Sequence, residues 1–270
     1  GEGNTRKEGV RGAWEVGFSK DGMYVMTVDK GGSVCVWETR KGAMVQRLEE
    51  KVYSAQLSAD GLRVATASKK NRVCVWEVAT GACIWTMVEH TERVGSVQLS
   101  TDAVRVVTTS EEGDAHVWDV ATATRSLTMK GVTSAHFSPE GMRVVTTSED
   151  GDAHIWDVAT GECVVSMKDE PMGFAEFSPD GQRVATASRG GASVWHAASG
   201  KCMQSFVGHT DCVTSVHFSP DGERVVTASD DYTARVWQVA TGTCLQILTH
   251  ANGVNSVQFS PDGLQVVTAS

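Results

Sequence analysis

Several features are missing from this sequence, and each absence excludes a class of protein. The chain of 270 residues contains no run of about eighteen consecutive apolar residues, so it has no candidate transmembrane helix. Its first ten residues, GEGNTRKEGV, lack the apolar segment of a signal peptide. We therefore expect a protein of the cytoplasm, or of the nucleus, that does not bind a membrane.

Cysteine is present, but not in a pattern that forms disulfides or binds metals. The seven cysteines are an odd number, and no two form a CxxC pair. Six of them recur at two equivalent positions of the repeats: Cys83, Cys163, Cys202 and Cys244 lie seven residues after a tryptophan, and Cys35 and Cys74 lie two residues before one. Disulfide partners and metal ligands must converge in space, whereas equivalent positions of different repeats lie apart. The pattern predicts small core-filling thiols, no metal and a reducing compartment.

Positive charge is scarce over most of the chain. Residues 1–85 carry 13 Lys and Arg against 10 Asp and Glu, whereas residues 86–270 carry 11 against 23, and the net charge is −9. An acidic surface repels phosphate backbones, so we expect no nucleic-acid binding. A basic protein partner is easier to accommodate on that part of the surface.

What the sequence does contain is a repeat of about 40 residues. Seven related segments, FSKDG, LSADG, LSTDA, FSPEG and three copies of FSPDG, begin 38 to 42 residues apart, at Phe18, Leu57, Leu99, Phe137, Phe177, Phe218 and Phe259. A tryptophan follows each of the first six at a nearly constant distance: Trp37, Trp76, Trp118, Trp156, Trp195 and Trp237. Such regularity indicates one structural unit copied along the chain.

Local patterns divide each unit into four short strands. In the sixth unit, CVTSVHF, ERVVTAS, TARVWQV and TCLQIL read as strands, and SPDG, DDY and ATG separate them as turns. In SPDG, proline presets φ at the second position, and glycine supplies a positive φ without steric cost. Ala103 stands at this glycine position in the third unit. We therefore expect backbone strain of about 1 kcal/mol there.

The repeat also identifies a fold family. A four-stranded sheet with apolar residues on both faces must stack on copies of itself, and radial stacking achieves this. The repeat length, the SPDG turn and the Trp-Asp pairs at Trp118 and Trp156 resemble the WD40 family. This resemblance implies an all-β fold, a WD40 β-propeller of seven blades with the last one incomplete: six full four-stranded blades plus two strands. We assign residues 13–270 to this single domain and residues 1–12 to an N-terminal tail.

The seventh unit stops at Ser270, after its second strand. In the WD40 family an N-terminal strand usually completes the last blade, and residues 2–7, EGNTRK, are placed for this role but have poor strand propensity. We expect the natural chain to continue beyond Ser270. Completion of the blade by a neighbouring chain is the alternative, because an unpaired strand edge invites pairing.

One constellation of polar residues superficially matches a hydrolase triad: His209, Asp231 and a hydroxyl at Thr227 or Ser229. The WD40 resemblance implies instead a hydrogen-bonded network inside the blade, made of loop histidine, turn acid, hydroxyl and tryptophan. The expected structural residues are Trp37, Trp76, Trp118, Trp156, Trp195 and Trp237, with His90 and Glu112 in the third unit and His209 and Asp231 in the sixth. The second unit has Lys70 in place of the acid and no loop histidine, so we expect packing alone to hold it.

A candidate docking patch lies just before the first strands of units one to three. Residues there commonly contact partners in the WD40 family, and in this chain they include Trp14, Lys51, Tyr53 and Arg93. Aromatic residues and arginine are typical of binding hot spots. Lys51 and Arg93 favour an acidic or phosphorylated peptide. A coincidental mix of channel lining and solvated rim is the alternative interpretation.

The sequence thus predicts a non-catalytic scaffold that binds protein partners through the top face or the edges of a propeller, with no cofactor and no small-molecule substrate. No converging set of catalytic residues and no nucleophile motif points to an enzyme. Two alternatives remain open. One is a WD40 sensor or regulatory array of a larger signalling protein, for example one linked to an NTPase, and the other is a structural subunit of a large assembly.

Overall fold

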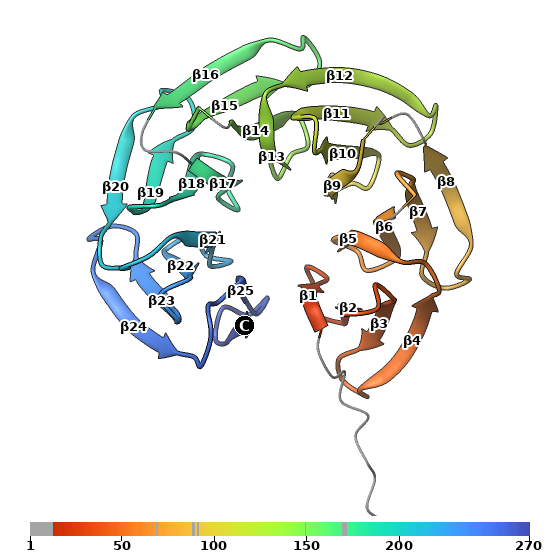
Figure 1. Cartoon of the computed structure of the whole chain (residues 1–270), viewed down its shortest axis with the longest axis horizontal. Helices are drawn as coiled ribbons and strands as arrows, with labels where there is room; N and C mark the ends of the chain where they lie inside the picture. Colours follow the sequence, from red (N-terminus) through yellow and green to blue (C-terminus); the bar gives the residue numbers. More distant parts are fainter. Residues whose placement is uncertain (1–12, 69, 88–89, 91, 149, 169–171) are drawn as a thin grey trace, which may run out of the picture.

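The chain folds into seven β-sheets, the blades, arranged in a ring around a central channel (Figure 1). This computed structural model describes residues 13–68, 70–87, 90, 92–148, 150–168 and 172–270. Within these residues, no helix is long and apolar enough to cross a membrane. The expected closing strand at residues 2–7, like the whole tail at 1–12, lies outside the described residues.

Each of the first six blades is an antiparallel meander of four consecutive strands, ordered from the channel outward. Blades 1 to 3 contain β1 (Ala13–Phe18), β2 (Tyr24–Asp29), β3 (Val34–Glu38) and β4 (Ala43–Leu48); β5 (Val52–Leu57), β6 (Arg63–Ser68), β7 (Val73–Glu77) and β8 (Cys83–Met87); and β9 (Val94–Leu99), β10 (Arg105–Ser110), β11 (Asp114–Asp119) and β12 (Thr124–Lys130). Blades 4 to 6 contain β13 (Val132–Phe137), β14 (Arg143–Ser148), β15 (Asp152–Asp157) and β16 (Cys163–Lys168); β17 (Met172–Phe177), β18 (Arg183–Ser188), β19 (Gly191–His196) and β20 (Cys202–Phe206); and β21 (Val213–Phe218), β22 (Arg224–Ser229), β23 (Thr233–Gln238) and β24 (Cys244–Thr249).

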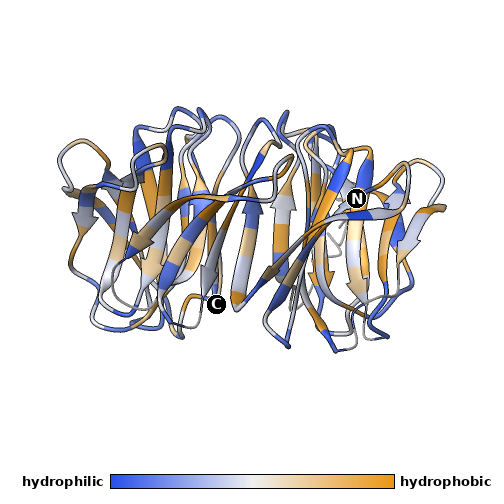
Figure 2. Ribbon diagram, turned by 90° about the horizontal axis from the view of Figure 1, so that it is seen from above, coloured by the Kyte–Doolittle hydropathy of each residue, from blue (hydrophilic) through white to orange (hydrophobic). Residues whose placement is uncertain are grey.

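The seventh blade contains two strands among the described residues, β25 (Ser256–Phe259) and β26 (Val266–Ala269). The prediction of six four-stranded blades plus two strands in an all-β propeller is therefore confirmed. Figure 2 views the disc from its edge and shows hydrophilic loops at both faces, with apolar stretches along the strands. We call the face that carries the loops before the innermost strands the top face.

A repeated side-chain network shapes the turn between the first and second strands. In blade 6, the hydroxyl of Ser219 donates to Asp221 Oδ1 at 2.5 Å, and the same oxygen accepts the backbone N–H of Glu223 at 2.9 Å. Gly222 in this turn has a φ of 70°. Ala103 has a φ of 54° at the equivalent position in blade 3, so the left-handed geometry expected from the sequence is present there.

The hydrophobic core lies between neighbouring blades rather than inside any one sheet. One cluster packs Val75 and Trp85 of blade 2 against Val97 and Trp118 of blade 3. Equivalent clusters fill the other interfaces from blades 1 and 2 through blades 6 and 7. Full burial of a large apolar side chain contributes about 1.5–3 kcal/mol, so each blade depends on its neighbours for stability.

Arginine side chains at the start of the second strands bridge neighbouring blades. Arg143 of blade 4 donates from Nη2 to the carbonyl of Gly181 at 2.9 Å, and its guanidinium carbon lies 5.0 Å from the ring centre of Phe177. Arg224 repeats both contacts on blade 7, 2.8 Å from the carbonyl of the turn glycine and 5.3 Å from the ring of Phe259. These bridges hold the turn of one blade against the preceding blade.

Blade 7 meets blade 1 through their inner strands. β26 lies beside β1, and the turn glycine Gly22 packs against Pro261, because a Cβ added at Gly22 would lie 3.2 Å from Pro261 Cγ. Within the described residues no strand lies outside β26, and Figure 1 shows the resulting gap between β24 and β4 at the rim. Among the described residues, the ring therefore closes near the channel, through β1 and β26, but not at its periphery.

Candidate functional site

Blade 6 contains a chain of four hydrogen-bonded side chains. Trp237 donates from Nε1 to Thr227 Oγ1 at 2.9 Å, and this oxygen lies 2.7 Å from His209 Nε2. His209 Nδ1 lies 2.8 Å from Asp231 Oδ2, and the side chains of His209 and Asp231 are only 1% and 3% exposed. Burial lowers the pKa of His209, so the neutral ring carries one N–H, which faces the carboxylate. Trp237 therefore donates to Thr227, Thr227 donates to His209, and His209 donates to Asp231.

This order is that of a catalytic triad, but the burial of the network prevents that chemistry. Thr227 is fully buried, and its oxygen already accepts the indole N–H, so no substrate reaches it. Burial alone would raise the pKa of Asp231, but hydrogen bonds from Thr233 and His209 outweigh burial and hold this pKa well below its usual range. The carboxylate is thus a charged acceptor that anchors the loop to the blade.

The hydrogen bond from tryptophan to threonine recurs in all six four-stranded blades. Its length is 2.8 to 3.0 Å in the pairs Trp37–Thr27, Trp76–Thr66, Trp118–Thr108, Trp156–Thr146, Trp195–Thr186 and Trp237–Thr227. Each indole N–H therefore has its acceptor on the second strand of the same blade, as a buried donor requires. The side chain that contacts the threonine hydroxyl in addition to the indole differs from blade to blade.

Blade 3 has a partial version of the network. His90 Nε2 lies 2.8 Å from Thr108 Oγ1, and the His90 ring stacks on His116 with 4.5 Å between ring centres. Glu112, the acid expected here, lies exposed in the turn between β10 and β11, unlike the buried Asp231. Burial, assisted by the neighbouring His116, lowers the pKa of His90 to about 4.

Blade 7 has a network histidine that the sequence reasoning missed. His250 Nε2 lies 2.8 Å from Thr268 Oγ1, as His209 does from its threonine in blade 6. Its Nδ1 is buried and has no hydrogen-bond partner in the described part of the chain. The signal was present in the sequence, because His250 precedes Phe259 by the same nine residues that separate His209 from Phe218.

The expectation that packing alone holds blade 2 is wrong. Trp76 donates to Thr66 at 2.9 Å, and Thr66 in turn lies 3.4 Å from a carboxylate oxygen of Glu50. Arg72 pairs with the other oxygen of Glu50, with 3.2 Å between Nε and Oε1. An ion pair between Glu50 of the loop before β5 and Arg72, directly before β7, thus replaces histidine and acid, while Lys70 is exposed.

The interpretation of the recurring cysteines as core-filling residues holds for two of them and in part for Cys244, which is half-buried against the core between blades 5 and 6. Cys35 and Cys74 on the third strands are buried free thiols. Cys83, Cys163 and Cys202 are exposed. They begin the outermost strands, whose outward side faces solvent, so a position that recurs with the repeat need not face the core.

The structure brings two of the four docking candidates into contact. The guanidinium carbon of Arg93 lies 3.9 Å from the ring centre of Tyr53, across the interface of blades 2 and 3. Arg93 Nη1 also lies 3.0 Å from Glu111 Oε1, and the arginine side chain is 44% exposed. Lys51 is exposed directly before β5. Trp14 lies in β1, but its side chain is outside the described residues.

The top face carries exposed residues of both charges, and one group of cations lies on blades 1 to 3. The exposed cations Lys30, Lys51 and Lys70 lie on blades 1 and 2, and we call them, with Arg93 of blade 3, the basic arc. Lys51 adjoins the turn of Lys30, because the next residue, Val52, donates its N–H to Gly32 O at 3.1 Å. Exposed acids also lie on this face, both beside the basic arc and beyond it: Glu49, Glu92, Glu111, Glu112, Asp150, Asp211 and Asp230. Further exposed cations lie on blades 3 to 5, at Lys130, Lys168 and Arg189.

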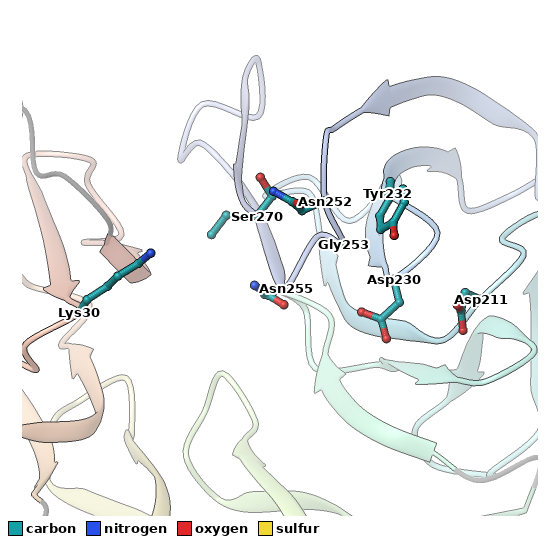
Figure 3. A pocket seen from close by; sticks show the side chains of 9 residues that line it. Lys30, Asp211, Asp230, Tyr232, Asn252, Gly253, Asn255 and Ser270 are labelled. Atoms are coloured by element: carbon teal, nitrogen blue, oxygen red, sulfur yellow. The ribbon is translucent and has the colours of Figure 1, made fainter.

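An open polar hollow of about 710 Å³ lies where blades 1, 6 and 7 meet. Figure 3 shows Lys30 on one side of it, with Asn252, Asn255 and Asp230 on the other. Its walls also include Ser270 and the ring of Tyr232. The lining is rich in groups that donate and accept hydrogen bonds and poor in apolar side chains, so it does not resemble a small-molecule pocket.

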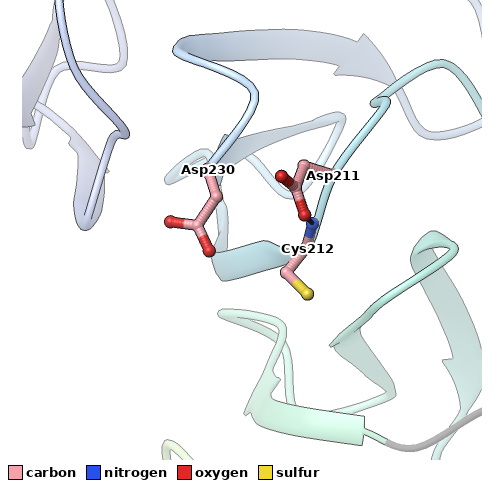
Figure 4. Close-up of side chains that lie close together, drawn as sticks. All are labelled: Asp211, Cys212 and Asp230. Carbon is pink, nitrogen blue, oxygen red and sulfur yellow. Dashed lines mark hydrogen bonds between the residues drawn. The ribbon is translucent and has the colours of Figure 1, made fainter.

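One group of side chains at the edge of this hollow has donor atoms close enough to share a cation. Asp211, Cys212 and Asp230 offer ligand atoms within 4.8 Å of one another (Figure 4). One Asp211 oxygen already accepts the N–H of Cys212 at 2.8 Å. Two carboxylates favour hard cations and a thiolate favours soft ones, so this donor set suits neither class well.

The channel contains ionisable groups that the sequence did not single out. Burial raises the pKa of Glu15 to about 7 and lowers that of His136 to about 4. The carboxylate of Glu176 pairs with His217 Nδ1 and raises the pKa of His217, although burial opposes this. The ring of Phe174 lies between those of His136 and His217, with 4.7 and 5.2 Å between centres. These groups bridge adjacent inner strands rather than converge on one reacting position.

Comparison with known families identifies the repeated unit. Four stretches match the family model described as WD domain, G-beta repeat (WD40), and together they cover more than half of the chain: residues 81–119, 123–157, 200–238 and 242–270. The first three run from the outer strand of one blade through the third strand of the next, so the sequence repeat is offset from the blade by one strand. A comparison with curated proteins gave no match.

Proposed function

Because the chain belongs to the WD40 repeat family, we propose that it is a non-catalytic scaffold whose top face binds an anionic segment of a partner protein. WD40 propellers generally serve as scaffolds for protein interactions. The observation that carries the specific proposal is the stack of Arg93 on Tyr53, at 3.9 Å, beside the exposed Lys51. A stacked, partly exposed guanidinium offers its donors in a fixed orientation, which lowers the entropic cost of binding.

The chemistry of the basic arc favours a carboxylate or phosphate as the bound group. Arginine recognises both through paired hydrogen bonds. In this structure Arg93 Nη1 already forms an ion pair with Glu111 Oε1 at 3.0 Å. An incoming anion exchanges with Glu111, which is itself exposed and stays solvated when released. A phosphate carries about twice the charge of a carboxylate, so it competes for Arg93 more effectively.

The acids elsewhere on the top face support a restricted binding position. Asp150 on blade 4 and Asp211 and Asp230 on blade 6 are exposed and repel an anionic segment. The anionic group of the segment therefore lies at Arg93 and Lys51 rather than over blade 4 or blade 6. A partner that also carries basic residues gains by placing them over the acidic blades.

The test is a binding titration with two fluorescent peptides of the same sequence, one with phosphoserine and one with glutamate at its centre, each with flanking acids. We expect both to bind, the phosphopeptide more tightly, with an affinity that falls as salt is raised. Arg93→Gln should weaken binding by about 10-fold, the scale of a hot-spot arginine.

Lys41→Gln is the matched control, because it removes the same charge from an exposed turn between β3 and β4 on the opposite face. It should leave the affinity within about twofold, as expected for a distant surface charge. Equal losses in the two variants would show that net charge alone attracts the peptide. Absence of binding by both peptides would remove the anionic-segment proposal while leaving the scaffold role to be tested with other partners.

A further inference from the structure

The repeat places a pair of side chains at the same outer position of every four-stranded blade. One member is on the third strand, two residues before the tryptophan, and the other is the first or second residue of the outer strand, nine residues later. The pairs are Cys35–Met44, Cys74–Cys83, His116–Arg125, His154–Cys163, Ser193–Cys202 and Arg235–Cys244 in blades 1 to 6. One backbone geometry therefore carries six different chemical combinations, and one of them joins a thiol to an imidazole.

In blade 4 this position forms a three-residue cluster on the rim of the disc. Cys163 Sγ lies 3.8 Å from His154 Nδ1 and 3.7 Å from Ser166 Oγ. The same ring nitrogen lies 3.0 Å from the Ser166 hydroxyl, which fixes the orientation of the imidazole. Cys163 is exposed at the start of β16, the outermost strand of blade 4 (Figure 1). A solvent-facing thiol with a base in hydrogen-bond reach is the arrangement that nucleophilic sulfur chemistry requires.

We propose that Cys163 is a modification site, at which the thiol exchanges with a low-molecular-weight disulfide with His154 as the base. His154 Nδ1 takes the proton of the Cys163 thiol as Sγ attacks one sulfur of the disulfide. A new bond forms between Cys163 and that sulfur, the original S–S bond breaks, and the departing thiolate takes the proton from His154. The protein thiol is oxidised to a mixed disulfide, and one equivalent of the small thiol is released.

Blade 5 contains the same site without the base. Cys202 is also exposed at the start of an outer strand, and its Sγ lies 3.6 Å from Ser205 Oγ, the counterpart of Ser166. Ser193 takes the position of His154, and its hydroxyl lies 3.1 Å from that of Ser205. The two blades thus differ in the residue beside the thiol, histidine in blade 4 and serine in blade 5. In both blades the cysteine is exposed, begins the outer strand and lies next to a serine hydroxyl. Cys202 is therefore an internal reference for the reactivity that exposure alone confers.

The experiment measures the modification rate of each cysteine in the intact chain with oxidised glutathione as the probe. Samples are quenched at successive times, free thiols are blocked, and peptide mass spectrometry gives the fraction of each cysteine in the mixed disulfide. We expect Cys163 to react about 100-fold faster than Cys202, at the lower end of the range for general-base assistance. His154→Ser should reduce the Cys163 rate to that of Cys202, and Ser193→His should raise the Cys202 rate.

The reciprocal substitutions separate a chemical role of the imidazole from a structural one, because only the former transfers with the residue to another blade. Folding is monitored in the same samples, since the buried Cys35 and Cys74 stay unmodified unless the propeller opens. Equal rates for Cys163 and Cys202 in the unsubstituted chain would overturn the proposal. A Cys163 rate that is unchanged in His154→Ser would overturn it as well.

Discussion

At the scale of single residues, burial decides which polar groups hold the fold and which remain for chemistry. Thr227, His209 and Asp231 have the donor order of a hydrolase triad, yet all three side chains are enclosed in blade 6. His154 and Cys163 have less regular geometry but face solvent. The two groups differ in residue type and spacing, and the exposure of the side chains decides which of them can meet a reactant.

The residue before each turn phenylalanine or leucine also stabilises the fold only where its surroundings supply a hydrogen-bond partner. Gln56 accepts the N–H of Leu99 at 2.5 Å, and Gln98 accepts the N–H of Phe137 at 2.7 Å, so each glutamine ties its strand to the next blade. His136 holds this position in blade 4, and its Nδ1 is buried without a partner among the described residues. A neutral ring is tolerated there, whereas a protonated ring would be a poorly solvated cation.

The low pKa of His136 predicts a specific loss of stability in acid. Burial lowers this pKa to about 4, below the value near 6.5 of an unfolded histidine. The unfolded chain therefore takes up the proton first, and the contribution of His136 to stability is complete above pH 6.5 and lost as the pH falls towards 4. The loss is at most about 3 kcal/mol, with Glu176 opposing it and His217 adding to it.

His136→Gln introduces glutamine, which is the residue at this position in blades 2 and 3. Glutamine has no titratable group. We expect the free energy of unfolding of this variant to fall less between pH 7 and pH 4.5 than that of the unsubstituted chain, by about 1–2 kcal/mol. Urea titrations at the two pH values measure both quantities. Parallel loss of stability in the two proteins would contradict the assignment, because His90 would then account for the acid sensitivity.

At the scale of the strand and its turn, two alanines adopt the left-handed backbone that glycine has in the other repeats. Ala103 has a φ of 54° between the first and second strands, and Ala123 has a φ of 56° between the third and fourth. Ala103 is 2% exposed and belongs to the core between blades 2 and 3, whereas Ala123 is exposed. The same strain therefore occurs once with a buried methyl group and once without.

The same substitution at these two alanines should have different effects on stability. Ala123→Gly should raise the free energy of unfolding by about 0.5–1 kcal/mol, because relief of the left-handed strain exceeds the entropic cost of glycine. Ala103→Gly should have little net effect, because loss of a buried methyl group removes about 0.8 kcal/mol. Urea unfolding of the two variants measures the difference. Equal stabilisation would mean that the Ala103 methyl contributes nothing to the core.

The strands and turns were predictable from the sequence because their signals are local and repeated seven times. The SPDG turns and tryptophans fix where each strand begins and ends, and the structure follows them. The exposure of Cys163 was not predictable in this way, since it depends on which side of an outer strand has a neighbour. The Glu50–Arg72 pair was missed because its members are 22 residues apart in a unit that lacks the usual histidine.

At the scale of the whole molecule, stability depends on neighbours in the ring. Each inter-blade core supports the two blades that it joins, so a blade with two such cores is harder to open than a blade with one. Blades 2 to 6 each have a core on both sides. The described residues form no such cluster between blades 7 and 1, which meet mainly through β26 and β1.

Hydrogen exchange in the chain of 270 residues should therefore be uneven around the ring. We expect the amides of β25, β26 and β1 to exchange at least about 10-fold faster than those of β13 and β14, because local opening there exposes one core rather than two. Exchange measured by mass spectrometry on peptides from each inner strand tests this, with β9 and β21 as further members of two-core blades. If each blade is stabilised only by its neighbours, protection should rise stepwise from the junction of blades 7 and 1 to blade 4. Uniform protection of all seven inner strands would instead show that the contact between β26 and β1 stabilises the junction of blades 7 and 1 as strongly as a complete core.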